Sequence, residues 1–353
     1  MKKVIFFIAI ICGCASLACA QKLNKTELKQ LKSFLAQTND KGASNAEMLK
    51  VDNINDFSGI EGLTIENGHI TSIKWKDKQL VGNLDLSGFK ALKTVDVSRN
   101  KLSTVSVAND PLLSHFNASR NNLSSVNFQN CPLLTSVSIN KNRLTEITLE
   151  NVPMLESLNL SNNLFVELNV SNIITLKSLD CQGCHLESLL IDGCVGLKYL
   201  DCSYNKLISL NLFGVENIQN LNVSDNQITT MIISGLKYLG TFVCTGNNMV
   251  TLGVRNCNNL TDLDCSYNSL KTFSVSGCPN LMFVDCSYND LTSLNLSNQN
   301  QLQRLLCDHN QLNTLDVTFD NSLTYVNCSY NLISDFRTVG CTNLQMVSNQ
   351  WNF

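Results

Sequence analysis

The sequence predicts a mainly β repeat solenoid, in which each turn adds one strand to a parallel concave sheet and one short extended segment to the convex side. From residue 92 to residue 343 the chain divides into twelve units of 21 residues, without insertion or deletion. Asparagine occupies the ninth position in eleven units, and all four prolines fall at position twenty. A fixed period of this length indicates a stacked array of coils.

The apolar pattern within one unit predicts where each side of the coil lies. In the unit LTDLDCSYNSLKTFSVSGCPN, which starts at Leu260, positions one, four, eleven and fourteen are apolar, as they are in all twelve units. Alternation around Leu263 and Cys265 predicts a short strand with every second side chain inward. Alternation around Phe273 and Val275 predicts a second extended segment on the opposite side. No unit has a helical period.

The recurrent asparagine predicts a buried polar row. An amide at a sharp bend can pair with free backbone groups of its own coil and the next, and without such partners its burial would be costly. We therefore assign these side chains a structural role. They are Asn100, Asn121, Asn142, Asn163, Asn205, Asn226, Asn247, Asn268, Asn289, Asn310 and Asn331, and Asn352 holds the same place in the last half-unit.

Both ends of a solenoid need covers, because each coil buries its apolar face only against its neighbours. Apolar residues at helical spacing, with Thr26 or Asn24 as a cap, predict a helix at about 25–37, and a polar connection follows at 38–60. At the far end, Trp351 and Phe353 are expected to shield the last coil. The predicted divisions are a signal peptide at 1–20, a cap region at 21–69, a divergent first coil at 70–91, the twelve repeats at 92–343, and a capping half-repeat at 344–353.

The first twenty residues have the pattern of an export signal. Two lysines precede an apolar stretch too short to span a bilayer, and Ala18-Cys19-Ala20 forms a small-x-small cleavage site. Cys19 also follows a segment close to a lipoprotein cleavage box, so a lipid anchor at Cys19 is the alternative to release. No other segment is long and apolar enough for a membrane helix. We expect an exported protein.

The units resemble leucine-rich repeats. The pattern LxxLxCxxNxLxxLxVxxxxx, as in LKYLDCSYNKLISLNLFGVEN from Leu197, is similar to the 21-residue repeats of bacterial internalin-like proteins, in which cysteine often replaces the sixth-position leucine. The segment GLTIENGHITSIKWKDKQLVGNLDLSGFKAL before them resembles the N-terminal region of such secreted proteins. The resemblance implies a right-handed, horseshoe-like coil that binds other proteins, with contact to a host or cell surface.

The chain has 16 cysteines, and their spacing is that of core residues. Seven hold position six and five hold position nineteen, so we expect two rows of buried thiols, mostly reduced. Stacked cysteines on parallel strands suit disulfide geometry poorly. Cys184 departs from the pattern, because it replaces the ninth-position asparagine and forms C-x-x-C with Cys181. A redox pair or part of a zinc site is the alternative to two core residues.

A ligand is expected on the concave sheet, at exposed positions three, five and seven, with position eight at the rim. Position eight begins basic, at Arg99, Arg120 and Lys141, and becomes aromatic toward the C-terminus. Exposed aromatic residues are enriched at binding surfaces, although rings on successive coils could also simply pack on one another. The candidate residues are Tyr199, Tyr204, Asp264, Tyr267, Phe283, Asp285, Tyr288, His309, Tyr325 and Tyr330.

These features favour a non-enzymatic binding scaffold for a protein partner, with a carbohydrate-binding surface of Tyr and Asp as the alternative. Net charge is −3 and charged residues make up 16%, which gives no electrostatic case for nucleic acid. No cofactor motif is present. Asp264 and Asp285 would lie about 4.8 Å apart, near the separation of a retaining glycosidase pair. Repeat spacing explains that distance on an open sheet, so we predict no enzymatic activity.

Overall fold

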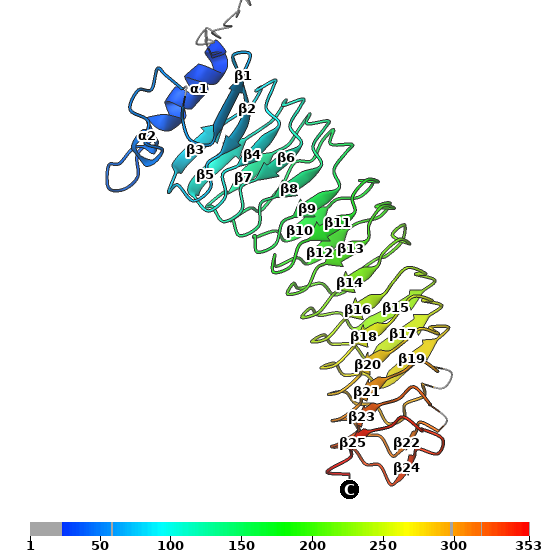
Figure 1. Ribbon diagram of the computed structural model, residues 1–353. Coiled ribbons are helices and arrows are strands. Elements are labelled where there is room, and N and C mark those ends of the chain that lie inside the picture. The colour runs from blue at the N-terminus through cyan, green and yellow to red at the C-terminus, as the bar shows by residue number, and fades with distance from the viewer. Residues whose placement is uncertain (1–22, 58, 297–298, 319, 353) are drawn as a thin grey trace, which may run out of the picture.

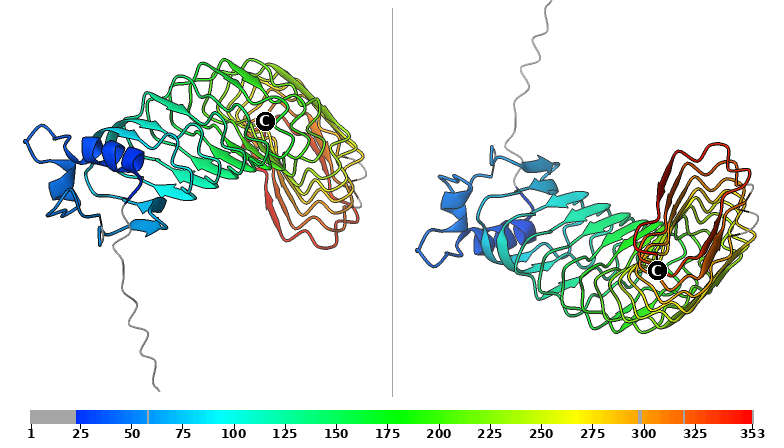
Figure 2. Two further views of the ribbon diagram at one scale, coloured as in Figure 1. Left: turned by 90° about the horizontal axis from the view of Figure 1, so that it is seen from above. Right: turned by 90° about the horizontal axis from the view of Figure 1, so that it is seen from below.

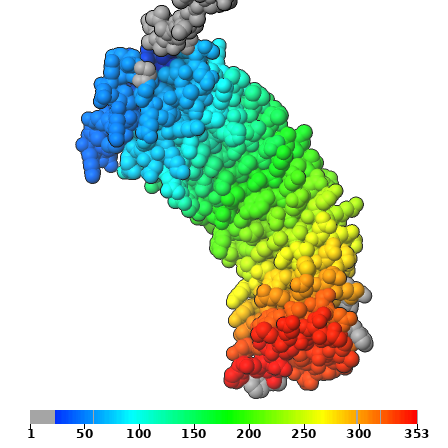
Figure 3. Space-filling model, viewed as in Figure 1, coloured from blue at the N-terminus to red at the C-terminus, as the bar shows by residue number. Residues whose placement is uncertain are grey.

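The protein is an elongated, curved coil that bends and twists from its N-terminal to its C-terminal end (Figures 1 and 2). The computed structural model describes residues 23–57, 59–296, 299–318 and 320–352. The predicted signal segment, Cys19 and Phe353 lie outside these residues. In the space-filling view the coils form one continuous body (Figure 3). This confirms the predicted mainly β repeat solenoid.

One long sheet runs the length of the coil, and we call it the main sheet. Its first two strands pair antiparallel, and every later pair is parallel, with repeat strands shifted by one 21-residue unit, as in Leu263 opposite Val284. In the described residues it has fifteen strands, in the order β1 (Leu63–Glu66), β2 (His69–Lys74), β4 (Thr94–Asp96), β6 (His115–Asn117), β8 (Ser136–Ser138), β9 (Ser157–Asn159), β11 (Ser178–Asp180), β13 (Tyr199–Asp201), β14 (Asn220–Asn222), β16 (Thr241–Val243), β18 (Asp262–Asp264), β20 (Phe283–Asp285), β21 (Arg304–Leu306), β23 (Tyr325–Asn327) and β25 (Met346–Ser348).

The opposite side of the coil carries short parallel sheets, whose strands mostly begin at unit position thirteen. They are interrupted along the chain, because some coils make this turn without strand hydrogen bonds. Their strands are β3 (Val81–Asp85), β5 (Lys101–Ser106) and β7 (Ser125–Asn127); β10 (Glu167–Asn169) and β12 (Ser188–Leu190); β15 (Thr230–Ser234), β17 (Thr251–Arg255) and β19 (Thr272–Ser276); and β22 (Thr314–Asp316) and β24 (Asp335–Arg337).

The asparagine at position nine ties each coil to the one before it. Asn226, which is 7% exposed, donates through Nδ2 to the carbonyls of Val223 in its own coil and Cys202 in the preceding coil, both at 3.0 Å. Its Oδ1 accepts from the Leu207 N–H at 2.9 Å. Equivalent bonds recur at Asn121, Asn247 and Asn310. The amide thus replaces backbone partners that the bend leaves unpaired.

The N-terminal end is covered by two helices. Helix α1 (Lys25–Leu35) is capped by Asn24, whose Oδ1 accepts from the Thr26 N–H, and it ends two residues before the expected boundary. It buries Leu31, Phe34 and Leu35 over the first coil, where the Phe34 and Trp75 rings stack at 5.9 Å. A short helix, α2 (Asn45–Met48), interrupts the segment expected to be a plain connection.

Within the described residues, Trp351 does not cover the last coil as expected. Val347 occupies inward position four, where earlier residues such as Val326 are fully buried, yet Val347 is 42% exposed. Trp351 is itself 57% exposed and stacks on Tyr330 instead of covering Val347. The predicted shield by Trp351 is therefore wrong, because the ring continues a stack along the edge of the coils. No helix in the described part of the chain is long and apolar enough to cross a membrane.

Cys184 replaces the asparagine in its coil, so substitutions at this position test how much the asparagine row stabilises the fold. Its thiol donates to the Leu160 carbonyl at 3.2 Å but provides no amide oxygen for the buried Phe165 N–H of the preceding coil. We expect Cys184→Asn to raise the free energy of unfolding by about 1 kcal/mol in urea titrations, because it restores a buried hydrogen bond. Cys181→Asn should lower stability, since position six faces the apolar core. Equal effects of the two substitutions would contradict this account.

Candidate binding surface

The side chains at unit position eight form a row along the coils, just beyond the carboxyl ends of the main-sheet strands. We call this row the rim row. Its backbone is left-handed in every coil, with φ between 52° and 64°. The N–H of Tyr267 donates to the Ser287 carbonyl at 3.1 Å, and other coils repeat this bond, so the backbone is fixed. Such a conformation costs a large side chain roughly 1–2 kcal/mol. The rim row consists of Arg99, Arg120, Lys141, Asn162, Gly183, Tyr204, Asp225, Gly246, Tyr267, Tyr288, His309, Tyr330 and Trp351.

A second left-handed position in the same coils shows which residues this backbone favours. At position eighteen every described residue is asparagine or glycine, the two types that adopt positive φ most readily. The rim row instead carries arginine, lysine, tyrosine, histidine and tryptophan in nine of its thirteen places. Position eighteen holds Asn109, Asn130, Asn151, Asn172, Gly193, Gly214, Gly235, Asn256, Gly277 and Gly340, while Asn298 and Phe319 lie outside the described residues.

The C-terminal part of the rim row is a continuous aromatic stack. The rings of Tyr267 and Tyr288 lie 4.3 Å apart between centroids, and those of Tyr288 and His309 lie 4.1 Å apart. His309 stacks on Tyr330 at 4.3 Å, and Tyr330 on Trp351 at 6.1 Å. The parallel register of the coils therefore brings together four of the predicted site residues. Trp351 extends the same stack.

Stacking decides which ring faces remain open to a ligand. Both faces of Tyr288 are covered by neighbouring rings, and this side chain is 39% exposed. Tyr267 is 57% exposed, because the preceding coil has Gly246 at position eight and adds no ring. The inner rings thus offer edges and hydroxyl groups, whereas Tyr267 also offers a face.

Tyr199 and Tyr204 lie apart from this stack. They belong to a coil three units before that of Tyr267, which corresponds to roughly 14 Å along the array. Tyr204 is 64% exposed between Gly183 and Asp225. The Tyr199 hydroxyl donates to Asp201 at 3.5 Å. The predicted aromatic residues of the rim therefore form one cluster and one separate site.

Position three of the C-terminal coils holds a second stack, which contains a residue that the sequence did not indicate. The Arg304 guanidinium carbon lies 5.5 Å from the ring centroids of both Phe283 and Tyr325. The register Phe283–Arg304–Tyr325 across β20, β21 and β23 places the three side chains in line. A lone arginine between two aromatic residues at 21-residue intervals is the signal that could have revealed it.

The carboxylates at position five are engaged within their own coils. Asp264 Oδ1 accepts from the N–H and hydroxyl of Ser266 at 3.0 and 2.6 Å, and Asp285 holds Ser287 in the same way. Burial is the main cause of a raised pKa for Asp285. Position seven was expected to be exposed, but Ser266 and Ser287 are only 4% and 5% exposed. That expectation is wrong, because this turn folds the serine back onto the aspartate.

The N-terminal part of the rim row is cationic. Arg99, Arg120 and Lys141 are exposed on three successive coils, and Lys101 and Arg143 are exposed two positions further along their units. Within the described residues no salt bridge neutralises any of these five side chains. The rim row therefore changes from positive to aromatic along one edge.

Cys181 and Cys184, which form the C-x-x-C motif, are fully buried. Burial raises the pKa of the Cys184 thiol to about 11 and that of Cys181 well above its usual range. Both thiols are therefore protonated at neutral pH and poorly suited to metal binding. Across the described residues, no group of three His, Cys, Asp or Glu side chains could hold a metal ion.

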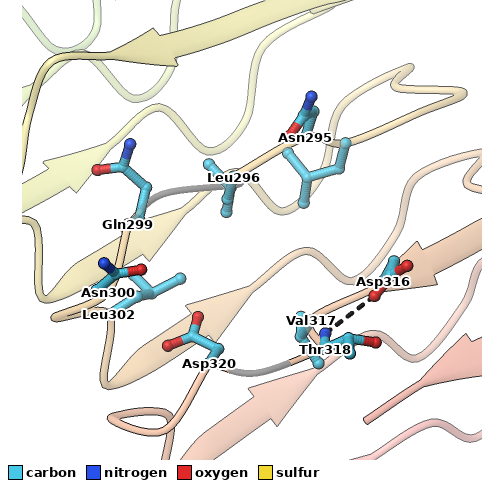
Figure 4. Close-up of a pocket in the computed structure, with 10 residues that line it drawn as sticks. Asn295, Leu296, Gln299, Asn300, Leu302, Asp316, Val317, Thr318 and Asp320 are labelled. Carbon is cyan, nitrogen blue, oxygen red and sulfur yellow. Dashed lines mark hydrogen bonds between the residues drawn. The ribbon is translucent and has the colours of Figure 1, made fainter. Parts of the chain in front are cut away.

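A hollow of about 530 Å³ lies on the opposite side of the coil, between the turns that follow Leu294 and Asp316 (Figure 4). Two oxygens of its lining residues, Gln299 Oε1 and Asp320 Oδ1, are buried without a hydrogen-bond partner in the described structure. Burial raises the pKa of Asp320 to about 6. Both residues occupy position nineteen, which is cysteine in five other coils. None of the predicted site residues lines this hollow.

Comparisons with known proteins agree with the repeat geometry. A family model described as Leucine Rich Repeat matches residues 217–239. An internalin, InlF from Listeria monocytogenes, is 16% identical over 90% of this chain and 94% of its own, with a TM-score of 0.50. YopM from Yersinia pestis is 20% identical over 79% and 88%, with a TM-score of 0.54. PEPR1 in its complex with AtPEP1 is 18% identical over 88% and 52%, with a TM-score of 0.61.

The fold and the repeat match define the class of this protein as a leucine-rich-repeat solenoid. The predicted leucine-rich-repeat fold is confirmed, since one unit matches the repeat model and the fold is similar to that of the internalin InlF. No curated protein matches the sequence.

Proposed function

We propose that this protein is a non-enzymatic, exported scaffold that binds a protein partner through the rim row and the adjoining main sheet. The observation that carries the proposal is the contrast between the two left-handed positions. Position eighteen is asparagine or glycine in eleven of twelve units, with Phe319 as the exception, whereas the rim row holds large charged or aromatic side chains in nine of thirteen places. Folding alone does not require those side chains, so a recognition role accounts for them.

Stacking between neighbouring rings explains the large side chains in only part of the rim row. An aromatic pair contributes about 0.5–1.5 kcal/mol, which is similar to the cost of a left-handed backbone at a large residue. For Tyr288 and His309 the stacking therefore offsets that cost. Tyr204 lies between Gly183 and Asp225 and has no ring on either side in the row. The basic residues at the N-terminal end of the row likewise gain no ion pair among the described residues.

The export part of the proposal rests on residues 1–20, which have a basic start, a short apolar stretch and a small-x-small cleavage site. Release after cleavage is the proposed outcome, with a lipid anchor at Cys19 as the alternative. Contact with a host or cell surface would follow from either. Mass spectrometry of the mature N-terminus distinguishes a free residue from a lipidated cysteine.

Asparagine substitutions test the rim row without disturbing its backbone. Asn162 already occupies this position, so Tyr204→Asn and Tyr267→Asn should fold as well as the parent chain. We expect each to weaken capture of a partner from cell-surface extracts at least tenfold, because exposed tyrosines are frequent hot spots. Tyr238→Asn is the matched control, since Tyr238 is 52% exposed but lies outside the row. Equal losses in all three variants would refute a role for the rim row.

A carbohydrate-binding surface is the second candidate, and the open face of Tyr267 favours it. A sugar ring could stack there, whereas Tyr288 has no free face. A glycan array separates the two functions. Binding of a glycan that Tyr267→Asn abolishes and Tyr238→Asn preserves would support the carbohydrate function, and loss of protein capture without any glycan signal would support the protein partner.

A further inference from the structure

The second stack of the main sheet holds an arginine in a fixed orientation. Arg304 lies in β21 between Phe283 of β20 and Tyr325 of β23, and its guanidinium carbon is 5.5 Å from each ring centroid. Phe283 and Tyr325 are half-buried, whereas Arg304 is exposed. Aromatic rings on both sides therefore restrict the guanidinium while leaving its outer edge accessible to solvent.

The guanidinium has no anionic partner of its own. In the described residues no salt bridge or side-chain hydrogen bond involves Arg304. The carboxylates that occupy position five in the two preceding coils end at Asp285, because β21 has Leu306 at that position. Asp308 is engaged with His309 at 2.9 Å and with Asn327 at 2.8 Å. The N–H groups of Arg304 thus remain available.

We infer that Arg304 is the anion-binding anchor of this surface and takes a carboxylate from an acidic side chain of a partner protein. The inference rests on the proposed protein-binding function and adds a specific chemistry to it. A planar guanidinium pairs with a carboxylate through two parallel N–H···O bonds, and restricting it beforehand lowers the entropy lost on binding. Arginine and tyrosine, which both belong to this stack, are among the residue types enriched at protein interface hot spots.

A random peptide library displayed on phage, selected on the immobilised full chain, tests this assignment even while the natural partner is unidentified. We expect the enriched peptides to share an Asp or Glu at one position. Their synthetic forms should bind at least tenfold more weakly to Arg304→Ala, and Arg304→Lys should also lose affinity, because it keeps the charge but lacks the planar fork. Arg255→Ala, which removes an exposed arginine from β17, is the matched control and should bind normally.

The possible outcomes distinguish a failure of the Arg304 inference from a failure of the proposed protein-binding function. Enriched peptides that lack an acidic residue, or that bind Arg304→Ala as tightly as the parent chain, would overturn the anchor and leave the protein-binding function standing. Failure to enrich any peptide would count against both. Tetragalacturonate supplies the same carboxylate chemistry from a saccharide. If it binds in an Arg304-dependent way and more tightly than the peptides, the protein assignment is overturned.

Discussion

At pH 8, Asp110→Cys is expected to raise the free energy of unfolding by roughly 3 kcal/mol. Asp110 occupies position nineteen and is fully buried, and its Oδ2 has no hydrogen-bond partner in the described structure. Burial raises the pKa of this carboxyl from 3.8 to about 8, although the Phe89 N–H donates to its Oδ1 at 2.8 Å. Cysteine is the residue found at the equivalent position in other coils, as Cys131 and Cys194 show.

The sign of the pH dependence follows from the raised pKa. Between about pH 4 and pH 8 the folded protein holds a proton that the unfolded chain has released, so the contribution of Asp110 to stability is complete below pH 4 and is lost as pH rises toward 8. The free energy of unfolding of Asp110→Cys, relative to that of the parent chain, should therefore rise by up to about 1.4 kcal/mol per pH unit across this range.

Urea unfolding at pH 4.5, 6 and 8 measures this difference. Asp225→Asn is the comparison variant, because it also removes one carboxylate, from an exposed residue of the rim row. If Asp110→Cys shows the same slope as the parent chain, Asp110 does not bind the extra proton and the account fails.

Asn226→Ala is expected to lower the free energy of unfolding by roughly 2–4 kcal/mol. The substitution removes the amide that receives the Leu207 N–H and donates to the carbonyls of Cys202, Val223 and Ser224, and those groups are buried. A buried backbone group left without a partner loses its hydration without compensation. The effect should exceed that of trimming an exposed side chain severalfold.

Asn248→Ala provides the comparison, because Asn248 is exposed in the next coil and its side chain is not part of the asparagine row. We expect it to change stability by less than about 0.5 kcal/mol. Chemical denaturation of both variants under one set of conditions checks the pair. Similar losses at Asn226 and Asn248 would mean that the row adds little to the stacking of coils.

The sequence predicted the array well because its period fixes both register and direction. Once Tyr267 and Tyr288 are assigned to the same place in successive coils, parallel pairing brings their rings together. The short helix α2 has too few residues for a helical period, although Ser44 and Glu47 form the capping box that marks its start. The position of Ser266 was predicted wrongly, because its burial depends on a turn that apolar alternation does not reveal.

The role of Arg304 could not be predicted from one unit, since it arises only where two other coils supply Phe283 and Tyr325. The exposed end at Val347 was missed for a related reason: a single aromatic residue nearby does not determine which neighbour it covers. Contacts between coils that differ from the repeat pattern therefore escape a search based on the pattern itself.

Because all twelve repeats have the same length, residues at one unit position are spaced at equal intervals along the molecule. Lys141 and Tyr267 lie six units apart, so the cationic and aromatic segments of the edge are held at a separation set by a whole number of turns. Loss or duplication of one 21-residue unit between them would change that separation by about 4.8 Å and leave the chemistry of both segments intact. Partners of different length could thus be matched by changing the count of coils alone.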